Sequence, residues 1–210
     1  MKKAGLARRD PPNLFATIAA YAWQRSNKMA QPFYTIGHST RTLEEFVALL
    51  QSAGVACVVD VRTVPRSRTN PQYNRETLPQ ALAPQGIAYS HIAALGGLRG
   101  KAAVASDVNA FWQNASFHNY ADYAMGPQFQ AGLAQLREIG AERPCAVMCA
   151  EAVWWRCHRR IIADYLLAAG ETVMHILGPQ KIEPARMTPA AQRDADGTLS
   201  YPAIQGEADE

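Results

Sequence analysis

The amino-acid sequence predicts an α/β domain, with a mainly parallel central sheet flanked by helices. Short apolar runs alternate with segments of helical periodicity between residues 33 and 178. Of the 210 residues, 48% are apolar and 19% are charged, which supplies a core for one compact domain and argues against disorder of the whole chain. The apolar runs fall short of the roughly 20 residues that span a bilayer, so no membrane partner is expected. The net charge of +3 does not by itself indicate nucleic acid.

The predicted domain covers residues 32–180, with disordered or loosely attached segments on either side. Residues 1–31 are basic and include one short predicted helix at 14–23, whereas residues 181–210 are acidic and rich in Ala, Pro, Asp and Gly. The acidic composition is typical of a mobile tail. The chain opens without the apolar segment of a secretory signal, and its four cysteines fit a reducing cytoplasm better than a disulfide scaffold.

Five strands are expected in the domain. They cover residues 33–38, 55–61, 87–92, 145–149 and 172–176.

The second of these runs is almost uninterrupted in apolar residues, as expected of a strand covered on both faces. Helices are expected between the strands. Thr42-Leu-Glu-Glu45 forms a capping box ahead of an apolar helical face. Further helical turns are expected over residues 120–139 and about 155–169.

Polar residues follow the carboxyl ends of the predicted strands, where open parallel sheets bind their ligands. His38 and Ser39 follow the first strand, in a turn that could bind an anion or merely cap a helix. Asp60 and Arg62 end the second strand on the same face, because side chains alternate along a strand. They are expected either to form a structural ion pair or to orient Arg62 toward an anionic ligand.

Two further segments add candidates for ligand binding. The loop after the second strand carries Arg66, Arg68 and Arg75 among amides and an aromatic residue, which suits phosphate or base contacts or a solvated flap. After the third strand, the adjacent Gly96 and Gly97 allow the backbone to approach a ligand closely.

Chemically reactive residues concentrate between 147 and 160. Cys149 and Glu151 stand at the end of the fourth strand, and Cys157, His158 and Arg159 stand near the start of the next helix. Arginines and a helix N-terminus would favour a thiolate there and hold an oxyanion. Glu151 is a candidate general base, or the partner of an arginine.

Three interpretations of this segment stay open. In the first, Cys149 or Cys157 is a nucleophile. Phosphatase chemistry is disfavoured, because the Cys-x5-Arg spacing would need an arginine where Trp155 stands. In the second, Cys149, Cys157 and His158 bind a metal, with His38 as a candidate fourth ligand. The metal interpretation ranks below the nucleophile interpretation, because the side chains of adjacent helical residues such as Cys157 and His158 point about 100° apart. In the third, the cysteines are structural and the charged groups bind a phosphate-bearing ligand without catalysis.

Several motifs together resemble one known family. They are Tyr34-Thr-Ile-Gly-His-Ser-Thr40, Asp60-Val-Arg62, Gly86-Ile-Ala-Tyr89, Leu95-Gly-Gly97, Tyr120-Ala-Asp-Tyr-Ala-Met125, Met148-Cys-Ala-Glu151 and Cys157-His-Arg159.

In this order, the motifs resemble the domain of unknown function 488, and the likeness runs through residues 33–178. The resemblance implies a bacterial or archaeal, cytoplasmic α/β domain, and it supplies no reaction.

The leading hypothesis from the sequence is an enzyme that acts on a phosphate-bearing substrate, either a nucleotide or a nucleic-acid component. Cys149 or Cys157 would be the reactive thiol, Glu151 the acid or base, and Arg62 with Arg159 the anion clamp. One alternative is a non-catalytic module that binds nucleotides or nucleic acid. The second is a zinc or iron protein. The sequence specifies no cofactor and no oligomeric state.

Overall fold

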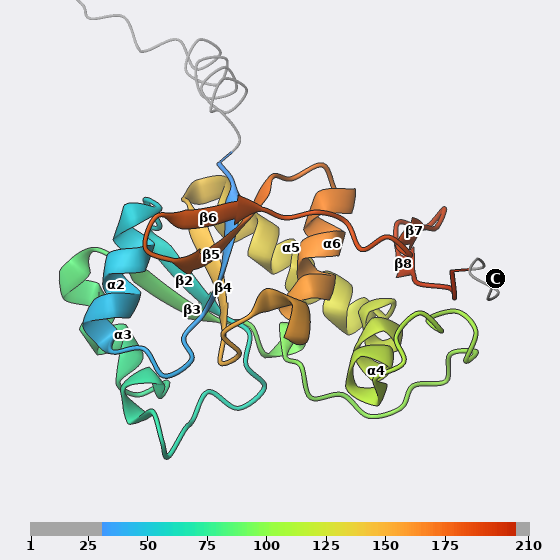
Figure 1. Ribbon diagram of the computed structural model, residues 1–210, viewed down its shortest axis with the longest axis horizontal. Helices are drawn as coiled ribbons and strands as arrows, with labels where there is room; N and C mark the ends of the chain where they lie inside the picture. Colours follow the sequence, from blue (N-terminus) through green and yellow to red (C-terminus); the bar gives the residue numbers. More distant parts are fainter. Residues whose placement is uncertain (1–30, 205–210) are drawn as a thin grey trace, which may run out of the picture. The chain divides into compact units, whose positions relative to one another are not determined.

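Six strands form one central sheet in the computed structural model of the chain, which describes residues 31–204 (Figure 1). The strands are β1 (Phe33–Gly37), β2 (Cys57–Asp60), β3 (Ala88–His91), β4 (Cys145–Cys149), β5 (Val173–Gly178) and β6 (Lys181–Pro184).

Their order across the sheet is β3-β2-β4-β1-β5-β6. The first five strands pair in parallel, and only β6 runs antiparallel to its neighbour. This confirms the predicted α/β class with a mainly parallel sheet.

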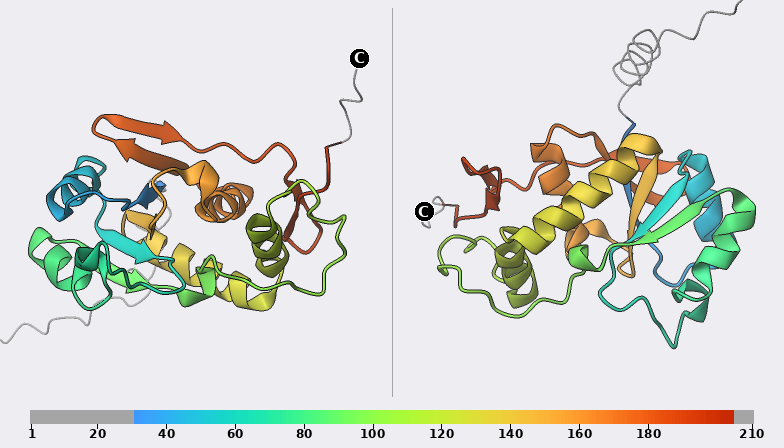
Figure 2. Two further views of the ribbon diagram at one scale, coloured as in Figure 1. Left: turned by 60° about the horizontal axis from the view of Figure 1, so that its bottom comes forward. Right: turned by 180° about the vertical axis from the view of Figure 1, so that it is seen from behind.

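Helices cover both faces of the sheet, as Figure 2 shows. One face packs against α2 (Leu43–Ser52) and α3 (Leu78–Leu82), and the other against α5 (Pro127–Glu142) and α6 (Arg159–Ala168). Helix α4 (Ala115–Ala124) packs against α5, away from the strands of the main sheet.

Four 3₁₀ turns, η1 to η4, and a two-stranded sheet complete the described part of the chain. Their bounds are η1 (Pro71–Tyr73), η2 (Ala83–Gln85), η3 (Ala93–Leu95), η4 (Trp154–Arg156), β7 (Gln192–Arg193) and β8 (Leu199–Ser200).

Local signals explain several of these elements. The Thr42 hydroxyl accepts a hydrogen bond from the Glu45 N–H, and the Glu45 carboxylate accepts one from the Thr42 N–H, so the predicted capping box is present. Val58 and Val59 are both fully buried but belong to the cores on opposite faces of the sheet. Coverage of both faces is the reason for the continuous apolar run in β2. Within residues 31–204, no helix has the length and apolarity needed to cross a membrane.

Two predicted helices differ from those in the structure. The segment 120–139 is divided between α4 and α5, because Gly126 and Pro127 separate them. Proline cannot donate an amide hydrogen bond and restricts the residue before it. The helix expected from about residue 155 begins at Arg159 instead. It follows η4 and the extended residue Cys157, whose φ and ψ are −131° and 144°.

The predicted mobile tail after residue 180 is wrong for residues 181–204. Strand β6 extends the main sheet, and Leu199 and Tyr201 are fully buried. The Tyr201 N–H donates to the Val108 carbonyl, and its hydroxyl lies 3.2 Å from the Asp164 carboxylate. A few well-placed apolar side chains therefore pack this segment despite its polar composition. Residues 205–210, the basic segment 1–30 and its predicted helix lie outside the described residues.

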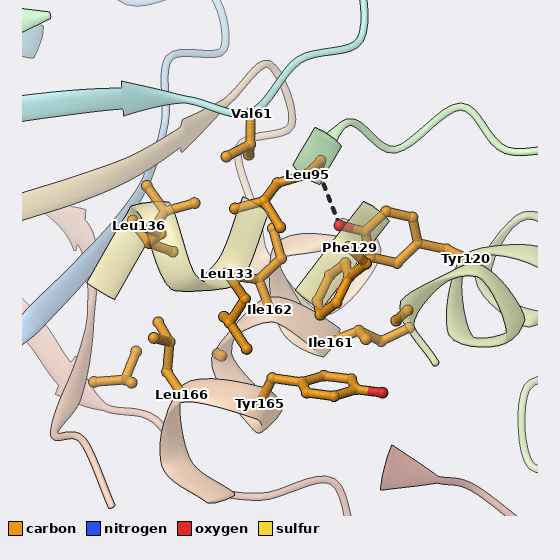
Figure 3. Close-up of a cluster of buried hydrophobic side chains, with 14 of the residues drawn as sticks. Val61, Leu95, Tyr120, Phe129, Leu133, Leu136, Ile161, Ile162, Tyr165 and Leu166 are labelled. Carbon is orange, nitrogen blue, oxygen red and sulfur yellow. Dashed lines mark hydrogen bonds between the residues drawn. The ribbon is translucent and has the colours of Figure 1, made fainter. Parts of the chain in front are cut away.

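A buried aromatic group connects α4 to the loop after β3 (Figure 3). The Tyr120 hydroxyl donates to the Leu95 carbonyl at 2.8 Å, and the Tyr120 ring packs edge-on against Phe129. On another side, the same ring contacts His158 edge-on, with 5.0 Å between the ring centres. Tyr120 thus packs α4 against the loop after β3 and against α5, and it also contacts a candidate site residue.

Candidate functional site

A cleft of about 730 Å³ opens at the carboxyl ends of the parallel strands. The sequence predicts eleven catalytic or substrate-binding residues apart from the basic loop. Eight of them line the cleft: His38, Ser39, Arg62, Gly97, Cys149, Glu151, Cys157 and His158.

The remaining three, Asp60, Gly96 and Arg159, are buried behind this lining. Segments that follow four strands, β1 to β4, therefore meet at one cleft, which is where open parallel sheets bind ligands.

The ends of β1 and β4 lie against each other in the floor of the cleft. The His38 N–H donates to the Cys149 carbonyl, and the Ser39 N–H donates to the Ala150 carbonyl, each at 2.9 Å. A Cβ at Gly37 would overlap the Glu151 carbonyl oxygen, so only glycine permits this approach. Ser39 has a φ of 50°, a left-handed conformation that is strained for serine. The turn after β1 is therefore held by β4.

Asp60, the last residue of β2, forms a buried ion pair with Arg62 two residues later, as alternation predicted. The Arg62 Nε and Nη2 atoms lie 2.9 and 2.6 Å from the Asp60 carboxylate oxygens, and the Tyr89 hydroxyl donates to the same carboxylate. The Arg62 Nη2 also donates to the Tyr73 carbonyl in the loop after β2. The guanidinium thus connects β2 to the loop that forms one wall of the cleft.

His38 completes this buried network as a neutral side chain. Its ring stacks on Tyr73, with 4.1 Å between the ring centres, and its Nε2 lies 3.3 Å from Nη1 of Arg62. The Nδ1–H donates to the Ser39 carbonyl. Burial lowers the pKa of His38 to about 4, with a contribution from the Arg62 charge. His38 therefore supports the cleft wall through contacts with protein groups.

Cys149, Cys157 and His158 form what we call the sulfur–imidazole cluster. The His158 Nδ1 lies 3.9 Å from the Cys149 sulfur and 3.6 Å from the Cys157 sulfur, and all three atoms are within 4.8 Å of one another. Cys157 precedes α6 in an extended conformation. Cys157 and His158 are therefore not successive residues of one helix. The expected 100° separation does not apply, and both side chains reach the same point.

The orientation of His158 is fixed from two sides. Its Nε2 lies 3.2 Å from the Val61 carbonyl, which can only accept, so Nε2 carries a hydrogen and Nδ1 faces the two sulfurs. A Cβ at Gly97 would lie 2.5 Å from Nδ1. The equivalent atom at Gly96 would lie 2.6 Å from the Thr63 hydroxyl. The two glycines thus permit close approach to protein side chains, where the sequence had suggested a ligand.

The two thiols of the cluster have opposite electrostatic environments. Burial raises the pKa of Cys157, but hydrogen bonds from Cys149 and His158 and the Arg159 charge together bring it well below its usual value. The hydrogen bond to Cys157, followed by burial, raises the pKa of Cys149 well above its usual value. The Arg159 Nε donates to the Cys157 sulfur at 3.3 Å, and its Nη2 donates to the Glu151 carbonyl. The arrangement favours one thiolate, on Cys157, beside one thiol.

The rim of the cleft combines one arginine of the predicted basic loop with residues that were not predicted as part of the site. Arg156 is exposed on the cleft, as is Arg66 from the predicted basic loop. Val64 and Leu98 also line it, with exposed fractions of 60% and 74%, as does Phe117. No sequence signal distinguishes these apolar residues from ordinary core positions, because their exposure depends on the tertiary arrangement.

The family model with the description "Domain of unknown function DUF488" matches residues 42–166 of this chain. The matched segment includes Asp60, Arg62, Gly97 and the whole sulfur–imidazole cluster, and it begins after the turn that holds His38. No curated protein and no solved structure matches the chain. The description of the family assigns no reaction.

Proposed function

Starting from the premise that this chain belongs to the DUF488 family, we propose that it is an enzyme acting on a phosphate-bearing substrate related to nucleotides or nucleic acids. The substrate would bind in the cleft, and the sulfur–imidazole cluster would be the reaction centre. The observation that carries the proposal is the position of two sulfurs and an oriented imidazole on an open cleft beside exposed guanidinium groups. Buried structural cysteines need no such access.

The rim of the cleft supports a nucleotide-like ligand. Arg66 and Arg156 are exposed and can bind phosphate oxygens, for which the planar guanidinium is well suited. Val64, Leu98 and Phe117 offer an apolar surface to a flat ring. A ligand that combines a dianionic phosphate with a flat aromatic base, whose ring faces can stack on apolar side chains, matches both parts of the rim.

The roles that we propose differ from the sequence-based assignment at one point. The guanidinium groups of Arg62 and Arg159 already bind protein groups, and Arg159 is only 1% exposed. We therefore assign the binding of phosphate to Arg66 and Arg156 and the stabilisation of the Cys157 sulfur to Arg159. Glu151, exposed on the cleft, remains the proposed acid or base. Because the proposal requires reduced thiols, it includes a cytoplasmic location.

Binding and turnover test this proposal separately. AMP and a short single-stranded DNA oligonucleotide are titrated calorimetrically, and product formation is followed by liquid chromatography and mass spectrometry, with and without added Zn²⁺. Arg156→Ala should weaken binding about tenfold or more, because a hydrogen bond to a charged group is lost. The matched control is Arg143→Ala. This exposed arginine precedes β4 at the opposite edge of the sheet and pairs only with Glu142 among the described residues.

Each outcome decides one part of the proposal. Binding that weakens in Arg156→Ala but not in Arg143→Ala, together with turnover that stops in Cys157→Ala, supports it. Binding of AMP or DNA without any product from the unmodified protein would favour the non-catalytic binding module. Equal binding by both arginine variants would refute the phosphate site on this rim.

A further inference from the structure

The sulfur–imidazole cluster has the dimensions of a tetrahedral metal site. Zinc lies about 2.3 Å from thiolate sulfur and about 2.0 Å from imidazole nitrogen, so tetrahedral angles separate a sulfur from a nitrogen by about 3.5 Å and two sulfurs by about 3.8 Å. The measured separations are 3.6 Å from His158 Nδ1 to the Cys157 sulfur and 3.9 Å to the Cys149 sulfur. All three atoms fall within 4.8 Å of one another. An ion at the centre would require only small side-chain adjustments.

We propose that Cys149, Cys157 and His158 bind one divalent ion of the zinc class, with a fourth coordination position open to the cleft. Two thiolates and an imidazole are soft and borderline donors, which select zinc, iron or cobalt over magnesium or calcium. All three residues line the cleft. Three protein ligands with one open position are typical of catalytic zinc sites, whereas structural sites supply four.

The groups around the cluster support ligation. Histidines that bind metals usually donate their second ring N–H to a carbonyl or carboxylate, which fixes the tautomer. The Val61 carbonyl occupies this position for His158. The Arg159 Nε donates to the Cys157 sulfur, a hydrogen bond suited to a thiolate ligand. Gly97 leaves the space beside Nδ1 that a larger residue would fill.

This inference deepens the proposed function and rests on it for the role of the ion, although metal binding can be measured independently. A bound ion would polarise a substrate oxygen or activate a water molecule. The phosphate would then bind to Arg66 and Arg156, as proposed above. The sulfurs would act as ligands of the ion, and this replaces the free nucleophile expected from the sequence.

Cobalt(II) provides a spectroscopic probe for the site. Reduced, tag-free protein is stripped with a chelator and titrated with Co²⁺. We expect one equivalent per chain, with sulfur-to-metal charge-transfer bands and the intense visible bands of tetrahedral cobalt, and we expect zinc to displace the cobalt. Cys149→Ala and Cys157→Ala should each weaken Co²⁺ affinity by more than about 100-fold. Loss of a residue that only hydrogen-bonds to a ligand weakens metal affinity by up to about 100-fold, and loss of a ligand itself should weaken it further. His158→Ala should do the same while retaining both thiols.

The matched control uses the other two thiols of the chain. Cys57 and Cys145 are buried partners on β2 and β4 at the opposite end of the strands from Cys149. Cys57→Ala and Cys145→Ala should retain the cobalt spectrum. Circular dichroism establishes that each variant is folded.

Three results would overturn the metal site. They are failure of the reduced protein to bind stoichiometric Co²⁺, unchanged affinity in folded Cys149→Ala and His158→Ala, and rapid alkylation of Cys157 by iodoacetamide in zinc-saturated protein. The last result would favour a free thiol nucleophile. If Co²⁺ fails to bind but the protein still binds AMP and forms product, the inference falls and the proposed function stands. If the protein binds stoichiometric Co²⁺ but neither AMP nor DNA, the metal site stands and the proposed function falls.

Discussion

Removal of the Asp60 carboxylate should destabilise the domain by about 3–5 kcal/mol, because it leaves a buried charge without its partner. Asp60 is fully buried, and Arg62 is 7% exposed. In Asp60→Ala, the Arg62 guanidinium would retain only the Tyr73 carbonyl and the His38 ring among its described contacts. This cost is a large fraction of the 5–15 kcal/mol that stabilises a typical domain.

Urea unfolding at constant pH measures the effect. Arg137→Ala is the control, because it breaks an ion pair with Glu171 in which the Arg137 side chain is 47% exposed. Such a pair contributes about 0–1 kcal/mol. The double variant Asp60→Ala/Arg62→Met should be more stable than Asp60→Ala alone, since it removes the unpaired charge. If Asp60→Ala loses no more stability than Arg137→Ala, the reasoning about the buried network is wrong.

Three further predictions concern the site, pH and the carboxyl-terminal segment. Gly97→Ala should lower Co²⁺ affinity at least about tenfold, because the added Cβ would displace His158. In the control Gly100→Ala the Cβ meets open space, so Co²⁺ affinity should be unchanged. Equal Co²⁺ affinities of the two variants would contradict the role of Gly97. Burial raises the pKa of Asp164 to about 6 from 3.8, so the folded state favours the protonated acid. Relative to Asp164→Asn, the unmodified protein should therefore lose about 2 kcal/mol of unfolding free energy as pH rises from 4 to 7, and a flat difference in urea titrations would refute this. Tyr201→Ala should lower the free energy of unfolding by about 3 kcal/mol, because the side chain is fully buried. Ile204→Ala, at a side chain that is 57% exposed, should change it by less than about 0.5 kcal/mol. Similar urea midpoints of the two variants would contradict the packing of this segment.

The sequence allowed prediction of features that depend on local pattern. The bounds of β4 agree with the expected residues 145–149, and the capping box at Thr42 is present. Alternation along β2 was sufficient to place Asp60 and Arg62 on the same face. Because parallel strands end at one edge, their polar ends could be expected to meet there.

Features that depend on tertiary contacts could not be predicted in this way. The extended conformation of Cys157 accompanies the insertion of His158 toward Val61 and of Arg159 toward Glu151. The helical periodicity of the sequence contains no information on these contacts. Composition likewise suggested a mobile segment after residue 180, although Tyr201 fits a cavity formed by distant residues.

X-ray absorption at the zinc edge of the zinc-loaded protein tests the central claim most directly. If the sulfur–imidazole cluster is the reaction centre, the first shell should contain two sulfurs at about 2.3 Å and one nitrogen at about 2.0 Å. Addition of AMP should change only the remaining light-atom ligand. A shell of nitrogen and oxygen alone, or a two-sulfur shell that persists in Cys149→Ala, would contradict the account.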